Sequence, residues 1–409
     1  MRFSFIHAAD LHIDSPLIGL SFKDQAVAAQ FAQAGRRAVE ALVNEVITSR
    51  AAFLIVAGDV FDGDWKDVAT GLFFVRAISE LHRQGIPVFM VRGNHDADSL
   101  MSRDLPYPES VKQFSSGKAE TITLEDHKVV LHGRSFPTRL ITADFVSTYP
   151  MRRDGWLNIG VLHTSLDGSR GHEGYAPCTV DDLKRYGYDY WALGHVHAAE
   201  IVSRDPWIVF PGNLQGRNPR ETGAKGAMRV TVEDGRVIDV TQLALDGARW
   251  EHLSVDVSDD ATEADMFDRM KTALQAAQAA SAGRPLAARI TLTGATPLHN
   301  KLIAQHEELL DDLRAAGFQA ASDCWVEQVK IKTSAPAPTA HRATNVESID
   351  VEDLLSAAST DQQFAVELTN LVKTVAEKMP KDLRDEFTQS EALKTLAADA
   401  RAMLLGRLS

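Results

Sequence analysis

FSFIHAADLH, at residues 3–12, joins an apolar run typical of a buried strand to two metal-ligand side chains, Asp10 and His12. Loops that leave the carboxyl ends of neighbouring strands converge in α/β sheets. We therefore expect the polar motifs that follow such strands to form one site. Four later apolar runs end in this way: residues 53–57 before GDVFD (58–62), 87–91 before GNHD (93–96), 157–162 before His163-Thr164, and 190–193 before GHVH (194–197).

The candidate ligands in these motifs are carboxylates, imidazoles and one amide, with no thiolate among them. This donor set suits Mn, Fe, Zn or Mg in a reactive site rather than a structural zinc. Two divalent ions bridged by a carboxylate are typical of enzymes that hydrolyse phosphate esters. Each motif alone has an ordinary explanation as a turn or a helix cap, but that explanation fails for the ordered set.

These motifs resemble the calcineurin-like metallophosphoesterase superfamily, and specifically its branch of SbcD-type DNA repair nucleases. GDVFD resembles the form found in bacterial SbcD, whereas phosphoprotein phosphatases of the superfamily usually have GDxxDRG and GNHE. Two further stretches, HAADLHIDSP at 7–16 and PGNLQGR at 211–217, resemble the YhaO-like subgroup. The resemblance covers residues 1–245 closely and the following region more loosely.

The resemblance implies two divalent ions, with Mn²⁺ preferred and Fe, Zn or Mg as alternatives, and a bridging Asp59. His95 would act on the phosphate or the leaving oxygen, as a general acid or a transition-state stabiliser. Asp62 would orient His95, and a helix N-cap is an equal alternative for Asp62. An extended H-x-H segment places both side chains on one face, so that they can reach adjacent ions. The implied ligands are Asp10, His12, Asp59 and His197 for one ion, and Asp59, Asn94, His163 and His195 for the other.

Several other polar residues near these motifs are expected to have structural roles. Asp96 is expected to cap the helix that follows its motif, and His7 and His132 to pack as structural histidines. Arg217 and Arg220 either contact DNA phosphates or lie in solvent, and neither is assigned to catalysis.

The predicted activity is that of a hydrolase, a metal-dependent phosphodiesterase. Its most specific form is a DNA exonuclease or endonuclease in repair or end processing, in which a metal-activated water attacks the phosphodiester. One alternative is a phosphodiesterase for small molecules or nucleotides, because fold and motif do not set the substrate. The other is a scaffold subunit of an ATPase complex, although a scaffold is expected to have lost ligands that this chain keeps.

Length and composition limit the class of protein and the functions that are possible. The chain has 409 residues, enough for two or three domains, with 44% hydrophobic and 24% charged residues. Its first residues lead directly into an apolar strand pattern, so we expect no secretory leader. No apolar run in the sequence is long enough to span a membrane, and Cys178 and Cys324 are outside any CxxC motif. We therefore expect a cytoplasmic protein with reduced thiols and no membrane partner. The net charge of −13 argues against holding nucleic acid by bulk electrostatics.

The order of predicted elements suggests four regions. Alternating strands and helices followed by short strands predict a four-layer α/β sandwich flanked by helices, the metallophosphoesterase domain, over residues 1–247. A strand-helix-strand-helix-strand pattern predicts a small α/β capping domain at 248–333. The Pro-containing composition of the next stretch predicts a linker at 334–345, and a helical C-terminal region follows at 346–409.

The C-terminal region is the expected docking segment for a partner. Phe364, Leu368, Leu371 and Val375 recur at helical spacing and form one apolar face. The resemblance implies a coiled-coil ATPase of the SbcC or YhaN kind as partner, alongside the DNA substrate, and it allows a homodimer. Folding of the tail back onto its own domain is an equally good reading.

Overall fold

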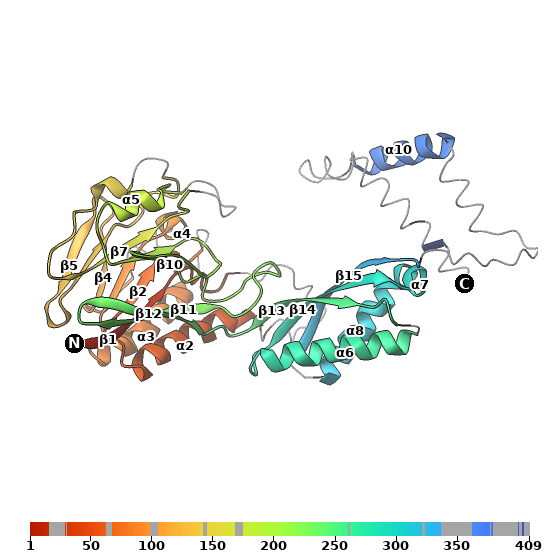
Figure 1. The fold of residues 1–409 in the computed structure, drawn as a ribbon, viewed down its shortest axis with the longest axis horizontal. Helices are drawn as coiled ribbons and strands as arrows, with labels where there is room; N and C mark the ends of the chain where they lie inside the picture. The colour runs from red at the N-terminus through yellow and green to blue at the C-terminus, as the bar shows by residue number, and fades with distance from the viewer. Residues whose placement is uncertain are drawn as a thin grey trace, which may run out of the picture. The chain divides into compact units, whose positions relative to one another are not determined.

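The computed structural model describes residues 1–15, 29, 31–62, 68–98, 105–141, 145–167, 175–260, 262–320, 324–336, 362–376, 378, 400, 403 and 404. The chain divides into two compact units. The first consists of residues 1–251 with 278–287, and the second of 252–277 with 288–409. Figure 1 labels the elements of each unit.

The first unit contains two six-stranded sheets, and the first sheet has the order β12-β11-β1-β2-β3-β4. Its central strands run parallel, and the helices between them provide the crossovers that parallel strands need. β11 and β12 continue the sheet in antiparallel fashion. The elements are β1 (Arg2–Ala8), α2 (Ala34–Thr48), β2 (Leu54–Ala57), α3 (Val68–Arg83), β3 (Val88–Val91), α4 (Asn94–Asp98), β4 (Val111–Gln113), β11 (Gly226–Glu233) and β12 (Arg236–Ala244).

The second sheet has the order β5-β6-β7-β8-β10-β9. β6, β7, β8 and β10 are parallel, and β5 and β9 close the two edges in antiparallel pairs. The elements are β5 (Glu120–Leu124), β6 (Val129–Gly133), β7 (Leu157–His163), α5 (Val180–Lys184), β8 (Tyr190–Gly194), β9 (Glu200–Arg204) and β10 (Trp207–Phe210), with short 3-10 turns at Glu125–His127 and Val146–Thr148.

Alternation along the strands creates the layers, because successive side chains of a strand point to opposite faces. Phe5 and Ile55 pack between the two sheets against Ile159, whereas Ile6 and Val56 face α2 and α3. A third apolar cluster, which includes side chains of β8, β10 and α5, covers the outer face of the second sheet. Figure 1 shows α2 and α3 beside the first sheet. The predicted α/β sandwich with outer helices is confirmed.

The second unit carries a three-stranded sheet in the order β13-β14-β15. The expected alternation of strands and helices is present, except that the second helix of the pattern is divided in two at Gln305. Met270 of α6 and Leu313 of α8 are fully buried. The elements are β13 (Arg249–Asp256), α6 (Glu263–Ala280), β14 (Leu286–Ala295), α7 (His299–Ala304), α8 (His306–Ala320) and β15 (Cys324–Ser334).

The C-terminal predictions meet the structure only in part. β15 extends to Ser334, so the predicted linker loses its first residue to the strand, and residues 337–361 lie outside the described part of the chain. One helix of the predicted helical region is described, α10 (Gln362–Ala376). Among the described helices, none combines the length and apolar character needed to cross a bilayer.

Candidate metal centre

The predicted motifs converge because the parallel strands of both sheets end at one edge. The loops after β1 and β2 run side by side there, with the Asp10 amide donating to the Gly58 carbonyl at 3.0 Å. The two sheets meet at the same place, where His163 Nδ1 at the end of β7 donates to the carbonyl of Ala57 at the end of β2, at 2.8 Å. Ligand candidates from both sheets therefore face one small volume.

The backbone of the ligand loops is unusual for residues that carry a side chain. Asp10, His12, Asp59 and His195 have φ angles of 51°, 42°, 53° and 103°. Residues other than glycine rarely adopt positive φ, and such strain gathers at functional sites. The strain is retained because it aims these side chains inward, where they are between 0% and 7% exposed.

Asp59 occupies the middle of the cluster. Its Oδ2 lies 3.3 Å from His163 Nε2 and 3.9 Å from His12 Nε2. Its Oδ1 accepts the backbone N–H of His95 at 2.9 Å. Burial opposes the negative charge, but His163 and His12 outweigh it and hold the pKa of Asp59 well below its usual range. Asp59 thus lies between two groups of imidazoles, as a bridging carboxylate would.

One group consists of Asp59, His163 and His195, whose ligand atoms lie within 4.8 Å of one another. Asn94 joins it, with Oδ1 placed 2.9 Å from His163 Nε2 and 3.2 Å from His195 Nδ1. Burial lowers the pKa of His163, but the Asp59 carboxylate outweighs burial and raises it to about 9. This group matches the second ligand set predicted from the sequence.

The other group consists of Asp10, His12 and His197, again with ligand atoms within 4.8 Å. Both Asp10 carboxylate oxygens accept the backbone N–H of His195, at 3.1 and 2.9 Å. His197 Nδ1 donates to Glu221 Oε1 at 2.8 Å. This hydrogen bond and the negative charge of Glu221 fix the orientation of the His197 ring. Sequence reasoning missed Glu221, because no motif marks it and only the fold brings it to His197.

Asp62 and His95 were predicted as a pair, but Asp62 contacts His12 more closely. Its Oδ1 accepts from His12 Nδ1 at 2.6 Å and lies 3.8 Å from His95 Nδ1. The His95 side chain is 30% exposed, compared with 18% for His197, 1% for His12 and 0% for His163, so His95 is the more open to a substrate. Burial, which outweighs the Asp59 charge, lowers the pKa of His95. The N-cap alternative for Asp62 depends on residues 63–67, which lie outside the described part of the chain.

Asp96 joins the two loops that carry Asp59 and Asn94. Its carboxylate accepts the backbone N–H groups of Val60, Phe61 and Gly93 at 3.0–3.2 Å. Burial and the nearby Asp59 raise its pKa to about 7. Asp96 therefore braces one ligand loop against another, beyond the capping role expected for it.

Two glycines of the motifs permit the close approach of these loops. A Cβ at Gly93 would overlap the Asp59 carboxylate. At Gly58, where φ is +96°, a Cβ would overlap the His163 ring. Any larger residue at either position would displace a candidate ligand.

The two histidines expected to be structural, His7 and His132, make their contacts outside the ligand cluster. His7 donates through Nε2 to the Leu193 carbonyl at 3.1 Å and contacts the Tyr190 hydroxyl at 3.0 Å. Burial lowers its pKa to about 3, so it stays neutral. His132 stacks on Tyr188, with ring centroids 4.6 Å apart. Both histidines therefore serve packing.

The donor chemistry fits divalent cations. His163 Nδ1 donates to a carbonyl and His12 Nδ1 to a carboxylate, so the Nε2 atoms of both rings face Asp59 and would be the ligand atoms for a cation. The buried His12 Nε2 has no hydrogen-bond partner among the described residues. Nitrogen and oxygen donor atoms of imidazole, carboxylate and amide groups converge here, and such a set of donors is suited to bind a divalent cation.

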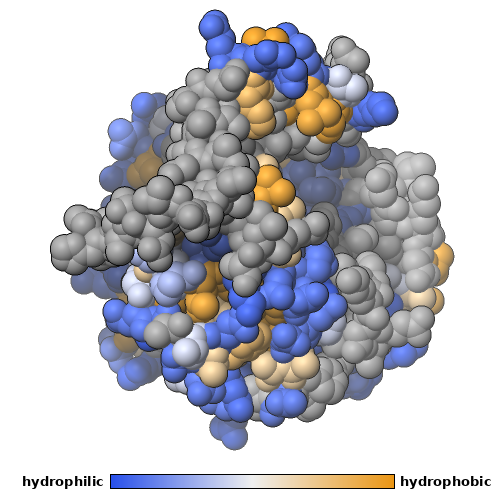
Figure 2. All heavy atoms as spheres, turned by 90° about the vertical axis from the view of Figure 1, so that its right-hand side faces the viewer, coloured by the Kyte–Doolittle hydropathy of each residue, from blue (hydrophilic) through white to orange (hydrophobic). Residues whose placement is uncertain are grey.

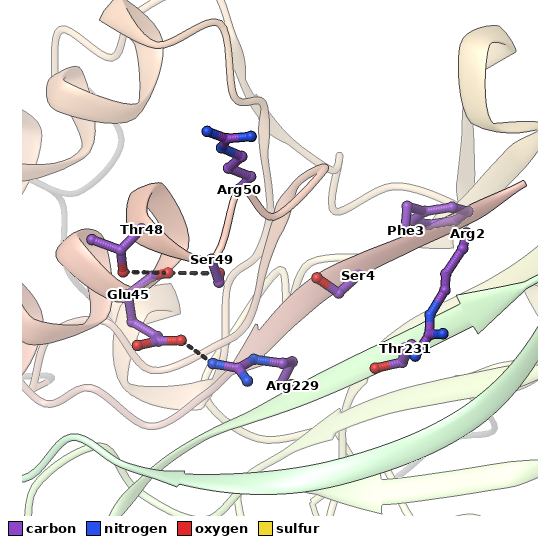
Figure 3. Close-up of a pocket in the computed structure, with 9 residues that line it drawn as sticks. All are labelled: Arg2, Phe3, Ser4, Glu45, Thr48, Ser49, Arg50, Arg229 and Thr231. Atoms are coloured by element: carbon purple, nitrogen blue, oxygen red, sulfur yellow. Dashed lines mark hydrogen bonds and ion pairs between the residues drawn. The ribbon is translucent and has the colours of Figure 1, made fainter.

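A hollow of about 550 Å³ lies at the opposite end of the first sheet, beside Arg2 and the C-terminal end of α2 (Figure 3). Some of its polar groups are paired with one another. Arg229 pairs with Glu45, and the Ser49 hydroxyl donates to the Glu45 carbonyl at 2.6 Å. The carbonyl end of a helix also disfavours anions. The candidate metal ligands gather at the other end of the sheets, at their carboxyl edge.

Two family models match the chain. The model described as calcineurin-like phosphoesterase matches residues 3–199, and the one described as metallophosphoesterase YhaO, middle domain, matches residues 250–334. A relative named uncharacterized metallophosphoesterase YhaO, from Bacillus subtilis strain 168, is 33% identical over 298 residues, which are 72% of each chain.

Two solved structures are similar to part of the chain. TT1561 of Thermus thermophilus has a TM-score of 0.35 at 13% identity, over 59% of this chain and 99% of its own. A dimetal phosphatase from Danio rerio has a TM-score of 0.35 at 11% identity, over 56% of this chain and 92% of its own.

Proposed function

The chain belongs to the calcineurin-like metallophosphoesterase family, and we propose that it is a phosphodiesterase of the nuclease type, with DNA as its substrate. The observation that carries the hydrolase reading is the buried cluster of two carboxylates, one amide and four imidazoles at the carboxyl edge of both sheets. The extension to DNA rests on the resemblance of the motifs to SbcD-type nucleases and on the presence of a second unit. A small diesterase needs no such unit.

The proposed metal ligands are Asp10, His12, Asp59 and His197 for one ion, and Asp59, Asn94, His163 and His195 for the other. Divalent cations held there, Mn²⁺ first among them, would supply Lewis-acid chemistry toward the phosphate and lower the pKa of water. Asn94 contributes a neutral oxygen and so limits the negative charge around the cations.

His95 is the residue we assign to the substrate. It is partly exposed, its main-chain N–H holds Asp59, and its ring contacts the His12 ring edge-on at 5.0 Å between centroids. The lowered pKa favours a neutral imidazole at neutral pH. A neutral ring still donates one hydrogen bond to a phosphate oxygen or to the leaving oxygen. We therefore propose transition-state stabilisation rather than full proton donation as its main role.

The test compares substrates on one Mn²⁺-loaded protein. Bis-p-nitrophenyl phosphate, p-nitrophenyl phosphate, and end-labelled single- and double-stranded DNA are incubated with the wild type and with Asp59→Ala. We expect the wild type to cleave the diester and DNA, and the variant to cleave neither. Hydrolysis of the monoester alone would make the protein a phosphatase. Cleavage of the small diester without DNA cleavage would favour the alternative, a small-molecule or nucleotide phosphodiesterase.

The partner proposal rests on α10. Leu371 and Val375 are one helical turn apart and are 62% and 43% exposed, while Val372 and Ala376 on another side are 4% and 2% exposed. In the space-filling view, apolar spheres break the polar surface at the height of α10 (Figure 2). We propose that this apolar stripe docks on the coiled-coil of an SbcC- or YhaN-like ATPase. Such a partner would also grip DNA, for which a chain of net charge −13 is poorly suited.

A further inference from the structure

Arg217 lies at the open side of the candidate metal centre. Its Nη1 donates to Asp62 Oδ1 at 3.2 Å and to Ser15 Oγ at 3.3 Å. Its side chain is 21% exposed, whereas the Asp59 and His163 side chains are at most 2% exposed. Arg217 and the partly exposed His95 therefore flank Asp62 on the side from which a substrate arrives.

The loop that carries Arg217 is anchored to the metal centre. β10 is parallel to β8, so the chain leaves β10 at the same edge as the ligand loops. The Arg217 N–H donates to Glu221 Oε2 at 2.7 Å, and the other oxygen of Glu221 accepts from His197. The Asn213 amide donates to Glu221 Oε2 as well, at 2.8 Å. One carboxylate thus fixes both a candidate ligand and the backbone of Arg217.

The guanidinium retains unused hydrogen-bonding capacity. Both of its side-chain contacts use Nη1, and Nε is buried without a hydrogen-bond partner among the described residues. A guanidinium has five N–H donors and recognises phosphate oxygens well. Asp62 pairs with Nη1 and balances part of the guanidinium charge, and the remaining donors can receive a second anion. The expected anion is a phosphate of the substrate.

The position of Arg217 bears on which substrate phosphate it can bind, the scissile phosphate or its neighbour. Its Nη1 is separated from the ligand atom of His12 by the Asp62 carboxylate and by the width of the imidazole ring. A phosphate held by the cations would lie at the far side of that ring. We propose that Arg217 binds the phosphate next to the scissile one, and so selects polynucleotides over diesters with a single phosphate. This inference rests on the proposed phosphodiesterase function.

The experiment uses three diesters on the full-length, Mn²⁺-loaded protein: bis-p-nitrophenyl phosphate and TpT, which carry one phosphodiester, and TpTpT, which carries two. We expect the wild type to prefer TpTpT by kcat/KM, and Arg217→Gln to lose this preference by about tenfold, the usual scale for a charge-assisted hydrogen bond. The variant should hydrolyse the two single-phosphate diesters like the wild type. Arg217→Lys, which keeps the charge without the planar fork, should fall between them.

Arg220→Gln is the matched control, because Arg220 is in the same loop, is exposed, and makes no side-chain hydrogen bond to a described residue. It should keep the preference for TpTpT. Metal content of each variant is measured alongside. Equal losses of Arg217→Gln on all three diesters, or reduced metal content, would assign Arg217 to support of Asp62 and overturn the inference. A wild type without preference for TpTpT would also overturn it. A wild type inactive on every diester would instead contradict the proposed function.

Discussion

The Asp62 carboxylate lies 2.6 Å from His12 Nδ1, and the opposite nitrogen of that ring faces Asp59. A carboxylate in this position fixes the tautomer of a ligating histidine and raises its basicity.

Asp62→Asn should therefore weaken metal binding while leaving the ligand set complete. An asparagine can still accept from Nδ1 but lacks the charge. We expect Mn²⁺ affinity to fall by about ten- to a hundredfold, measured by titration calorimetry. Asp14→Asn is a suitable control, because Asp14 pairs with Arg36 and Thr70 rather than with a ligand. Unchanged affinity in Asp62→Asn would show that this contact does not tune His12.

Asp59→Ala should lose both ions. Asp59 lies between the two imidazole groups, within 3.3 Å of His163 and 3.9 Å of His12. Elemental analysis of the purified variant is the measurement, with circular dichroism to verify the fold and Asp181→Ala, on α5, as the control. Full metal stoichiometry in Asp59→Ala would refute a bridging role for Asp59.

His95→Gln should separate catalysis from metal binding. Its contact with Asp59 is through the main-chain N–H, which the substitution keeps, so both ions should remain. The rate on a diester should fall by about a hundredfold, the scale of a positioned catalytic group. His12→Gln is the contrast, because it should lose metal as well as rate. Wild-type turnover in His95→Gln would remove this residue from the mechanism.

His7 should make folding stability depend on pH. Burial lowers its folded pKa from 6.5 to about 3, so the unfolded chain binds more protons between these values. The stability that neutral His7 contributes is complete above pH 6.5 and is lost as the pH falls toward 3. The loss from this group should be about 2 kcal/mol at pH 5.

Urea unfolding in EDTA at pH 7 and pH 5, followed by tryptophan fluorescence, measures this loss. His7→Gln should be less stable at pH 7 but should lose less on acidification. His82→Gln, at an exposed position on α3, should keep the wild-type dependence. An unaltered pH dependence in His7→Gln would mean that other groups account for the acid sensitivity.

Leu371→Glu with Val375→Glu should abolish co-purification with the coiled-coil ATPase, since both side chains are exposed on the stripe of α10. Deletion of residues 346–409 should have the same effect, and hydrolysis of a small diester should persist in both. Asn370→Glu adds charge to an exposed polar position of the same helix and should leave the complex intact. A complex that survives the double substitution would place the docking site elsewhere.

The sequence predicted the strands that carry the ligands within one or two residues, because each is a short apolar run that ends in a polar motif. β4, β5 and β6 were not predicted. β4 has three residues, and in β5 every residue is partly or fully exposed. β6 is fully buried, but its apolar run is short and no ligand motif follows it. The second helix of the capping domain was predicted as one element, because the break at Gln305 carries neither glycine nor proline.

The candidate ligands came from sequence, but their supports did not. Glu221 and Arg217 reach the centre only because β10 is parallel to β8, which no local pattern encodes. Asp62 was assigned to His95 through the resemblance, whereas its short contact is with His12, 50 residues earlier. Contacts between distant segments depend on strand order, and strand order is set by the whole sandwich.

The hydrogen bond between His163 and the Ala57 carbonyl joins the two sheets, so the metal centre also has a role in stability. The ligands that face each other come from different sheets, so bound ions would link the two sheets along one edge of the sandwich. Farther inside, apolar side chains hold the sheets together. During synthesis, a chain whose edge has not yet taken up metal carries several buried carboxylates and imidazoles in close contact. Metal supply in the cell would then govern how much of the newly made protein survives proteolysis, independently of any effect on turnover.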